Sequence, residues 1–144
     1  MTAPVPGWAA ALLREGRVAR LGTADAAGRP LVVPVCYVFD GERCYAPIDA
    51  KPKRSPGRTL RRVRNIEENP RVSLLVDRWD EDWAGLRWVI VEGRADLVHA
   101  GPVLARAVAL LVAKYPQYDA LALADRFEAV IRIAPERLLA WSFS

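Results

Sequence analysis

Apolar residues recur along this chain in short runs separated by polar turns, and β-branched and aromatic residues fill many of the runs. This composition is typical of strands. Turn signals between the runs, such as Asp40-Gly41, indicate hairpins. We therefore expect strands at residues 17–25, 31–40, 42–49, 71–79 and 86–99, and two short strands within residues 127–144.

Proline and glycine refine the predicted strands. Pro34 has no N–H to donate to a sheet ladder, so it marks a sheet edge or a bulge. Gly93 lies inside a long strand pattern and indicates a bulge. Ala134-Pro135 is expected to separate the last two strands. Residues 31–39 are apolar on both faces, which predicts a strand covered on both sides, with a cofactor or a second subunit as one cover.

Three segments have helical spacing of apolar residues: 8–16, 59–69 and 102–115. The order is then helix, three strands, helix, two strands, helix, two strands. Hairpins dominate this order, and strand–helix–strand alternation does not. We expect a single mainly β (α+β) domain over residues 1–144, an antiparallel barrel with peripheral helices.

Charge is concentrated in one place. The chain has a formal net charge of +4, and residues 51–64 contain seven basic residues and no acidic one. Like charges this close repel unless an anion compensates them. The segment runs from the end of a strand into the start of a helix, which is a favourable position for an anion. It predicts a bound phosphate or polycarboxylate; the basic residues are Lys51, Lys53, Arg54, Arg58, Arg61, Arg62 and Arg64.

Two other interpretations of this segment remain open. It could be a solvated, charged helix face. Against this, Arg58, Arg61 and Arg62 are three and four residues apart, so we expect them to share one helix face, on which they could clamp a phosphate. It could also contact nucleic acid, but proteins that bind single strands place aromatic residues among the basic ones. Residues 51–64 contain no aromatic residue. We therefore expect neither a nucleic-acid partner nor a membrane partner, since no apolar run approaches the length of about 20 residues that a span requires.

The remaining chemistry is sparse. Trp83 lies in a polar stretch and is a candidate to cover a planar ligand, although packing explains most tryptophans. The two cysteines are expected on opposite faces of a hairpin, so we predict no disulfide. His99 is the only histidine, and no metal-binding spacing is present. The first residues lack a basic leader, which favours a cytoplasmic protein.

An anion site, apolar walls and no evident nucleophile suit a protein that holds a phosphorylated redox cofactor. The segments VARLGTADAAGRPLVVPVCYVFDGERCYAPID and RVRNIEENPRVSLLVD resemble the pyridoxamine 5′-phosphate oxidase-like split β-barrel superfamily. IDAKPKR and RWVIVEGRADLV are similar to its branch of probable deazaflavin (coenzyme F420)-dependent oxidoreductases. The resemblance implies an FMN-binding-like split barrel and a homodimer with cofactor sites at the subunit interface.

The resemblance also implies which residues bind the cofactor. The phosphate would be held by Lys51, Lys53, Arg54, Arg58 and Arg62. The ring would lie along Val33, Pro34, Val35 and residues 45–49, which end at Asp49. Asn65 matches an asparagine of the family whose role is structural. We find no equivalent of the residues that pyridoxamine phosphate oxidases use for their substrate.

The expected activity is hydride transfer from reduced F420 to an unsaturated small-molecule substrate. The basic excess suits the phosphate and oligoglutamate tail of that cofactor. The alternatives are an FMN-dependent oxidase or reductase and a non-catalytic module that binds flavin or haem. No catalytic residue is assigned, and Tyr37, Tyr45 and water remain open as proton donors.

Overall fold

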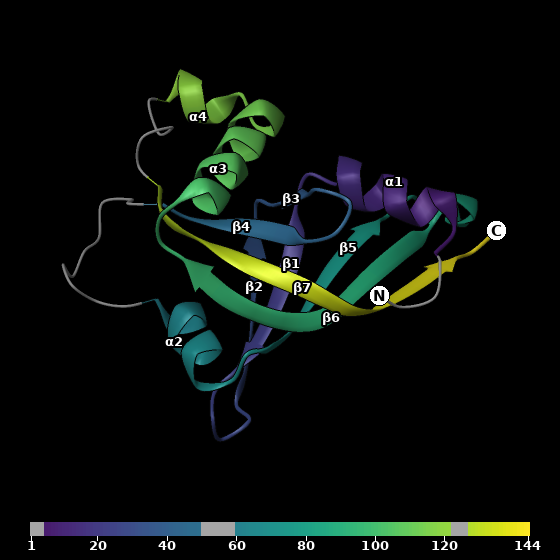
Figure 1. Ribbon diagram of the computed structural model, residues 1–144. Helices are drawn as coiled ribbons and strands as arrows, with labels where there is room; N and C mark the ends of the chain where they lie inside the picture. The colour runs from purple at the N-terminus through teal and green to yellow at the C-terminus, as the bar shows by residue number, and fades with distance from the viewer. Residues whose placement is uncertain (1–4, 50–59, 122–126) are drawn as a thin grey trace.

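The computed structural model describes residues 5–49, 60–121 and 127–144. Seven strands form one sheet, with helices at its ends and edges (Figure 1). The strands are β1 (Ala19–Ala24), β2 (Pro30–Val35), β3 (Val38–Phe39), β4 (Cys44–Asp49), β5 (Arg71–Arg78), β6 (Arg87–Val98) and β7 (Phe127–Ser142). The helices are α1 (Gly7–Glu15), α2 (Arg61–Glu68), α3 (Pro102–Lys114) and α4 (Gln117–Ala120), with a 3₁₀ turn η1 (Trp83–Gly85).

All strand pairs are antiparallel, and the sheet order is β2-β1-β5-β6-β7-β4-β3. The sheet curls strongly on itself without joining its two edges (Figure 1). The predicted antiparallel split β-barrel with peripheral helices is therefore confirmed. Pro34 lies in the edge strand β2, where its missing N–H costs no ladder bond.

The prediction of two short final strands is wrong. β7 is one strand of 16 residues that passes through Ala134-Pro135. Its register against β6 shifts at Glu92/Gly93, where Glu92 pairs with Arg137 and Gly93 pairs with Pro135. A bulge lies where it was predicted, opposite Gly93, but its extra residue, Glu136, belongs to β7. This explains the error, because a bulge is a position at which an interior strand tolerates proline.

The prediction of one strand over residues 31–40 is also wrong. β2 pairs with β1 at one edge of the sheet, and β3 pairs with β4 at the other, so the chain crosses the split at residues 36–37. At this crossing, the side chains of Lys114 and Tyr115 make the hydrogen bonds that a neighbouring strand would otherwise make. The Tyr37 N–H donates to the Tyr115 hydroxyl at 3.2 Å, and the Tyr37 carbonyl accepts from Tyr115 at 3.1 Å and from Lys114 at 3.0 Å.

The expected double cover of this strand is likewise absent within the protomer. Alternate residues of β2 are only half-buried on the core side, and Val32 on the other face is 65% exposed. The next hairpin has a different register from the one expected for a two-residue turn at Asp40-Gly41. Phe39 pairs with Cys44, a shift of two residues that leaves every side chain on its face. Both cysteines are free, as predicted.

Two apolar clusters hold the fold together. The larger lies inside the curl and includes Ala9 and Leu13 of α1. The smaller lies between α3 and the β3–β4–β7 edge, around Leu111, Tyr115 and Val130. The predicted apolar side of α2 is confirmed, because Ile66 is buried and Leu60 and Val63 pack on the larger cluster. None of the described helices is long and apolar enough to cross a membrane.

Candidate functional site

A cavity of about 290 Å³ lies at the split of the barrel. The edge strand β2 and the crossing that follows it form one wall, and β4, α2 and α4 contribute one residue each. The lining residues are Arg17, Val18, Pro34, Val35, Cys36, Pro47, Arg62 and Tyr118. The lining of the cavity is therefore largely apolar, and its two charged groups are the guanidinium groups of Arg17 and Arg62.

The structure brings together four of the residues predicted to bind the cofactor. Pro34, Val35, Arg62 and Pro47, from the predicted range 45–49, all line this cavity. Val33 packs against the larger core cluster and does not line it. Asp49 ends β4 at a register shift against β7. The other four predicted residues lie outside the described part of the chain: Lys51, Lys53, Arg54 and Arg58.

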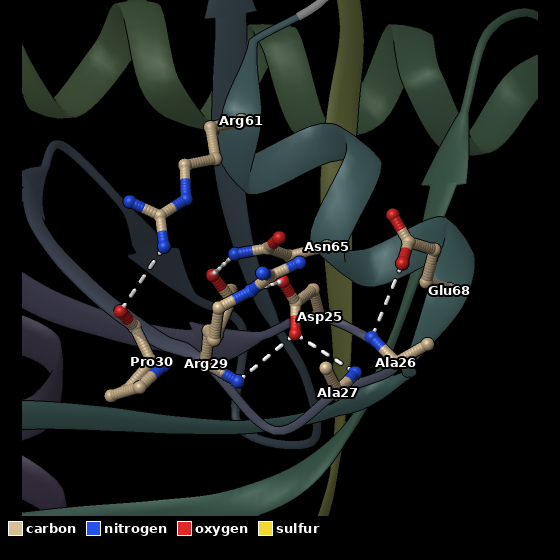
Figure 2. Close-up of polar contacts among 9 residues, drawn as sticks. Asp25, Ala26, Ala27, Arg29, Pro30, Arg61, Asn65 and Glu68 are labelled. Atoms are coloured by element: carbon tan, nitrogen blue, oxygen red, sulfur yellow. Dashed lines mark hydrogen bonds and ion pairs between the residues drawn. The ribbon is translucent and has the colours of Figure 1, made fainter.

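The helix α2, which carries Arg62, is fixed against the β1–β2 hairpin by two hydrogen bonds (Figure 2). Buried Asn65 donates from Nδ2 to Thr23 Oγ1 at 3.0 Å. Glu68 Oε1 accepts from the Ala26 N–H at 3.2 Å, in the turn between the two strands. These contacts support the structural role that the resemblance implies for Asn65. They attach the helix to the sheet on the side away from the cavity.

The arginines of α2 do not all lie on one face of the helix. Arg61 Nη2 lies 3.4 Å from the Pro30 carbonyl, and Arg61 lines a separate cavity of about 310 Å³ with Arg64 (Figure 2). Arg62, the next residue, lines the cavity at the split. The expectation that Arg61 and Arg62 lie together is therefore wrong, since one helical step of about 100° separates them around the helix.

Sequence reasoning missed the second cation of the cavity, Arg17. Its guanidinium lies 4.6 Å from the centroid of the Tyr115 ring and donates through Nη2 to the Lys114 carbonyl at 3.1 Å. Lys114 is itself half-buried, with Nζ 4.0 Å from the Tyr37 ring centroid. Burial, and then the nearby Arg17, lower the pKa of Lys114 to about 8. Nothing in the local sequence joins these residues, because they are far apart along the chain.

Neither tyrosine considered as a proton donor is available at the cavity. The Tyr37 side chain is fully buried, and its hydroxyl donates to the Leu13 carbonyl at 2.6 Å. Burial raises the pKa of Tyr37, which makes it a poorer acid. Tyr45 is buried in the smaller apolar cluster. Neither residue lines the cavity, so water remains the open donor among the three.

The other reactive groups do not form a site. Burial raises the pKa of Cys44 to about 12, so this thiol is inert. His99 is exposed at the end of β6 and does not line the cavity. The described residues contain no cluster of His, Cys, Asp or Glu that could hold a metal ion. The cavity therefore suits a ligand that brings its own chemistry.

A larger cavity of about 630 Å³ lies on the outer face of the sheet, but it is a weaker candidate. It contains none of the predicted cofactor residues, and its charges include both signs. Arg137 pairs with Glu92 at 3.9 Å across its wall. Paired charges leave little net attraction for an anionic ligand.

Trp83 lies far from the cavity within one protomer. The start of β7 pairs with β4 near Pro47, whereas its end pairs with the start of β6, next to the η1 turn that carries Trp83. These positions, Val130 and Ser142, are separated by roughly 40 Å of strand. Trp83 is 58% exposed there. Its predicted role as a cover for the ligand stays a prediction, and it requires a second protomer.

Comparisons with known proteins agree with this architecture. The family described as pyridoxamine 5′-phosphate oxidase matches residues 7–142. No functionally curated protein matches the sequence. The chain is similar to the haem storage protein HutZ from Vibrio cholerae, with 21% identity, a TM-score of 0.70, and coverage of 92% of this chain and 90% of that one.

Two further solved structures share the fold. A conserved hypothetical protein from Mycobacterium tuberculosis is 23% identical with a TM-score of 0.72, over 97% of this chain and 86% of that one. A protein described as an F420 reductase is 24% identical with a TM-score of 0.64, over 94% of this chain and 98% of that one. At these identities the likeness concerns the fold.

Proposed function

The chain belongs to the pyridoxamine 5′-phosphate oxidase family, and from this premise we propose that it is an oxidoreductase that transfers a hydride from reduced coenzyme F420 to an unsaturated small-molecule substrate. The observation that supports this most is the cavity at the split, where Arg62 and Arg17 stand beside an apolar floor of proline and valine. A family named for an oxidoreductase and a fold shared with an F420 reductase support the same conclusion.

The residues of the cavity fit a cofactor of this kind. Pro34, Val35 and Pro47 contribute apolar atoms to the lining beside which a planar ring could lie, and Arg62 can pair with a phosphate through two parallel hydrogen bonds. The volume of about 290 Å³ lies at the low end of the range of roughly 300–1,000 Å³ for ligand pockets. The proposed second protomer and the basic residues outside the described part of the chain would enlarge this site.

When bound, the deazaflavin supplies the hydride from its C5. The chain binds and orients the ring, and its apolar floor keeps water from one face. Arg62 holds the negative end, together with the basic residues of 51–58. FMN has a single phosphate and no oligoglutamate tail, so it requires fewer cations. The basic excess is what favours F420 over FMN in this proposal.

A non-catalytic module that binds flavin or haem is the alternative from another class. The shared fold with a haem storage protein supports it. Haem iron in proteins is held by His, Cys, Met or Tyr. His99 does not line the cavity, whereas Cys36 and Tyr118 do. Stopped-flow consumption of reduced F420 with a panel of enones and quinones separates the two classes, because a storage module turns over none of them.

We propose further that two copies form a homodimer with a cofactor site at their interface. The exposed edge strand β2, with Val32 65% exposed, and the uncovered tryptophans support this. A site that is small in one protomer would be enlarged by the second copy. Sedimentation velocity measures the oligomeric state, and a monomer at micromolar concentration contradicts the dimer.

Titration of FMN and F420, followed by fluorescence, tests the cofactor. We expect tighter binding of F420, and we expect Lys53→Ala combined with Arg62→Ala to weaken it by a few kcal/mol, at roughly 1.5–3 kcal/mol for each charged hydrogen bond. Arg64→Ala is the control, since Arg64 lines the other cavity of α2. Wild-type protein that binds neither cofactor contradicts the proposed function. Unchanged affinity in the double variant removes Lys53 and Arg62 from the site.

A further inference from the structure

Arg17 is held in place before any ligand arrives. Its guanidinium stacks on Tyr115 at 4.6 Å, and one of its five N–H groups donates to the Lys114 carbonyl at 3.1 Å. The Tyr115 hydroxyl also bonds to the Arg17 carbonyl at 3.0 Å. Both the side chain and the backbone of Arg17 are therefore anchored to the end of α3. Arg17, held in this way, also lines the cavity at the split.

The positive charge at this rim has no acidic partner. In the described part of the chain, no carboxylate forms an ion pair with Arg17 or with Lys114. Other arginines of the sheet are paired at short range, such as Arg20 with Asp77 at 2.7 Å and Arg132 with Asp96 at 2.6 Å. Arg17 and the neighbouring Lys114 thus place positive charge without an acidic partner beside the cavity that Arg17 lines, which favours an anionic or strongly polar oxygen in that cavity.

The two arginines of the cavity differ in their surroundings. Arg62 belongs to α2, which directly follows the basic residues predicted to hold a phosphate. Arg17 precedes β1 and stands beside the crossing at residues 36–37. A ligand with a phosphate at one end and a polar ring at the other would match these two arginines, with the phosphate on Arg62 and the ring on Arg17.

We propose that Arg17 binds the dione edge of the cofactor ring and stabilises the negative charge that this edge gains on reduction. This inference rests on the proposed function. Flavin and deazaflavin rings both present a carbonyl beside a ring nitrogen on their pyrimidine side, and positive charge near that nitrogen tunes the electronics of the ring. A planar guanidinium presents two parallel N–H donors in a fixed fork that matches two neighbouring acceptors, whereas an ammonium lacks this fixed geometry. Arg17 thus determines specificity for the cofactor ring, and it is separate from the residues that bind the phosphate.

The test compares FMN with lumiflavin, which has the ring but no phosphate. Arg17→Gln should weaken both ligands by the same factor, roughly tenfold or more for a charged hydrogen bond. It should also weaken reduced FMN about tenfold more than oxidised FMN, which lowers the two-electron midpoint potential of the bound flavin by about 30 mV. If only F420 binds, F420 and its ring-only analogue replace this pair.

Two further variants keep the test decisive. Arg14→Gln is the matched control, because Arg14 also stacks on an aromatic ring, at 5.8 Å from the Phe39 centroid, but does not line the cavity. It should change neither affinity nor potential. Arg17→Lys keeps the charge without the planar fork and should give an intermediate affinity. If Arg17→Gln fails to fold by circular dichroism, the lysine variant carries the comparison.

The outcomes separate this inference from the proposed function. Wild-type binding with no effect of Arg17→Gln on lumiflavin or on the potential overturns the inference and leaves the function intact. Weaker FMN with unchanged lumiflavin places Arg17 in the phosphate grip and also overturns it. Unchanged flavin binding with a raised KM for substrate assigns Arg17 to the substrate instead. Wild-type protein that binds neither cofactor overturns the function and the inference together.

Discussion

The two ends of the curled sheet expose opposite kinds of surface. The end at the split carries cations stacked on aromatic rings, such as Arg17 and Lys114 around Tyr115. The end at η1 carries aromatic rings without such cover, and Trp79, Trp83 and Phe143 are 64%, 58% and 55% exposed. The difference teaches that the two ends differ in chemistry, which supports the proposals of a charged ligand at one end and of a second copy of the chain at the other.

The aromatic end is nevertheless well built beneath its surface. Trp88 stacks with Trp141 across β6 and β7, with ring centroids 6.3 Å apart. Arg87 lies over the Trp8 ring at 5.4 Å, which joins α1 to this end. The exposed rings therefore lie above well-packed side chains, and their exposure does not reflect poor packing at this end. Four predictions test the comparison between the two ends, from the largest expected effect to the smallest.

The bulge in the middle of the sheet should have the largest effect, because it sets the curl that separates the two ends. A Cβ at Gly93 would lie 2.2 Å from the Ala134 carbonyl oxygen, which is backbone and cannot move aside. Gly93→Ala should cost roughly 2–3 kcal/mol of the free energy of unfolding. Gly22→Ala is the control, since its Cβ would meet nothing closer than 3.6 Å. Equal stability of the two variants in urea unfolding would contradict this account.

The attachment of α2 comes next, and it concerns only the end at the split. Thr23→Val leaves the buried Asn65 amide without its partner and should cost about 1–3 kcal/mol. Asn65→Leu should cost a similar amount, and the double variant less than the sum of the two. A double-mutant cycle in chemical unfolding measures this coupling. Fully additive costs would mean that the hydrogen bond does not hold the helix.

A substitution at the aromatic end should weaken the association of two copies and leave the stability of the protomer nearly unchanged. Trp83→Ser removes an exposed ring, so the protomer should change by at most about 0.5 kcal/mol in unfolding free energy. If two copies meet at this end, the dissociation constant of the dimer should rise at least about tenfold, which corresponds to roughly 1.4 kcal/mol. Sedimentation equilibrium gives this constant. An unchanged constant would show that Trp83 lies outside the interface.

The pH dependence of Lys114 should be the smallest effect, because Lys114 is only half-buried and solvent screens its charge; its sign is fixed. Burial lowers the pKa of Lys114 from 10.5 to about 8, so the unfolded chain binds the proton more tightly than the folded one. The unfolding free energy of the wild type relative to Lys114→Met should therefore rise between pH 8 and 10.5. A flat or falling difference in that window contradicts the assignment.

The variant is needed because other groups act in the opposite direction. Burial raises the pKa of Cys44 from 9.0 to about 12, and it raises the pKa of Tyr37 above its usual value of 10.0. These groups keep their protons in the fold after the unfolded chain has lost them. Their contribution to stability falls as the pH rises above those unfolded values, so the wild-type curve alone is a sum of both signs.

Local sequence patterns were sufficient to predict those features of the fold that depend on residues close together in the chain. The apolar side of α2, the bulge opposite Gly93 and the edge position of Pro34 were all predictable, because each follows from residue type and spacing. Pro135 was misread because its tolerance depends on the partner strand, where Gly93 leaves room for it.

The candidate site was predictable in its apolar strand and in Arg62, but not in Arg17. The strand pattern and the resemblance both led to Pro34 and Val35. The break at residues 36–37 has no local signal, because the groups that replace its ladder come from Lys114 and Tyr115. The same two residues orient Arg17, so the missed break and the missed cation have one physical cause.

The Tyr115 hydroxyl bonds to the backbone on both sides of the crossing at the split, and Tyr115 is 78 residues later in the chain than Tyr37. During synthesis, the crossing must wait for that residue to be made before its N–H and carbonyl find protein partners. The wall of the cavity can therefore be completed only after residue 115 has been made, although its own residues lie about 80 positions earlier in the chain.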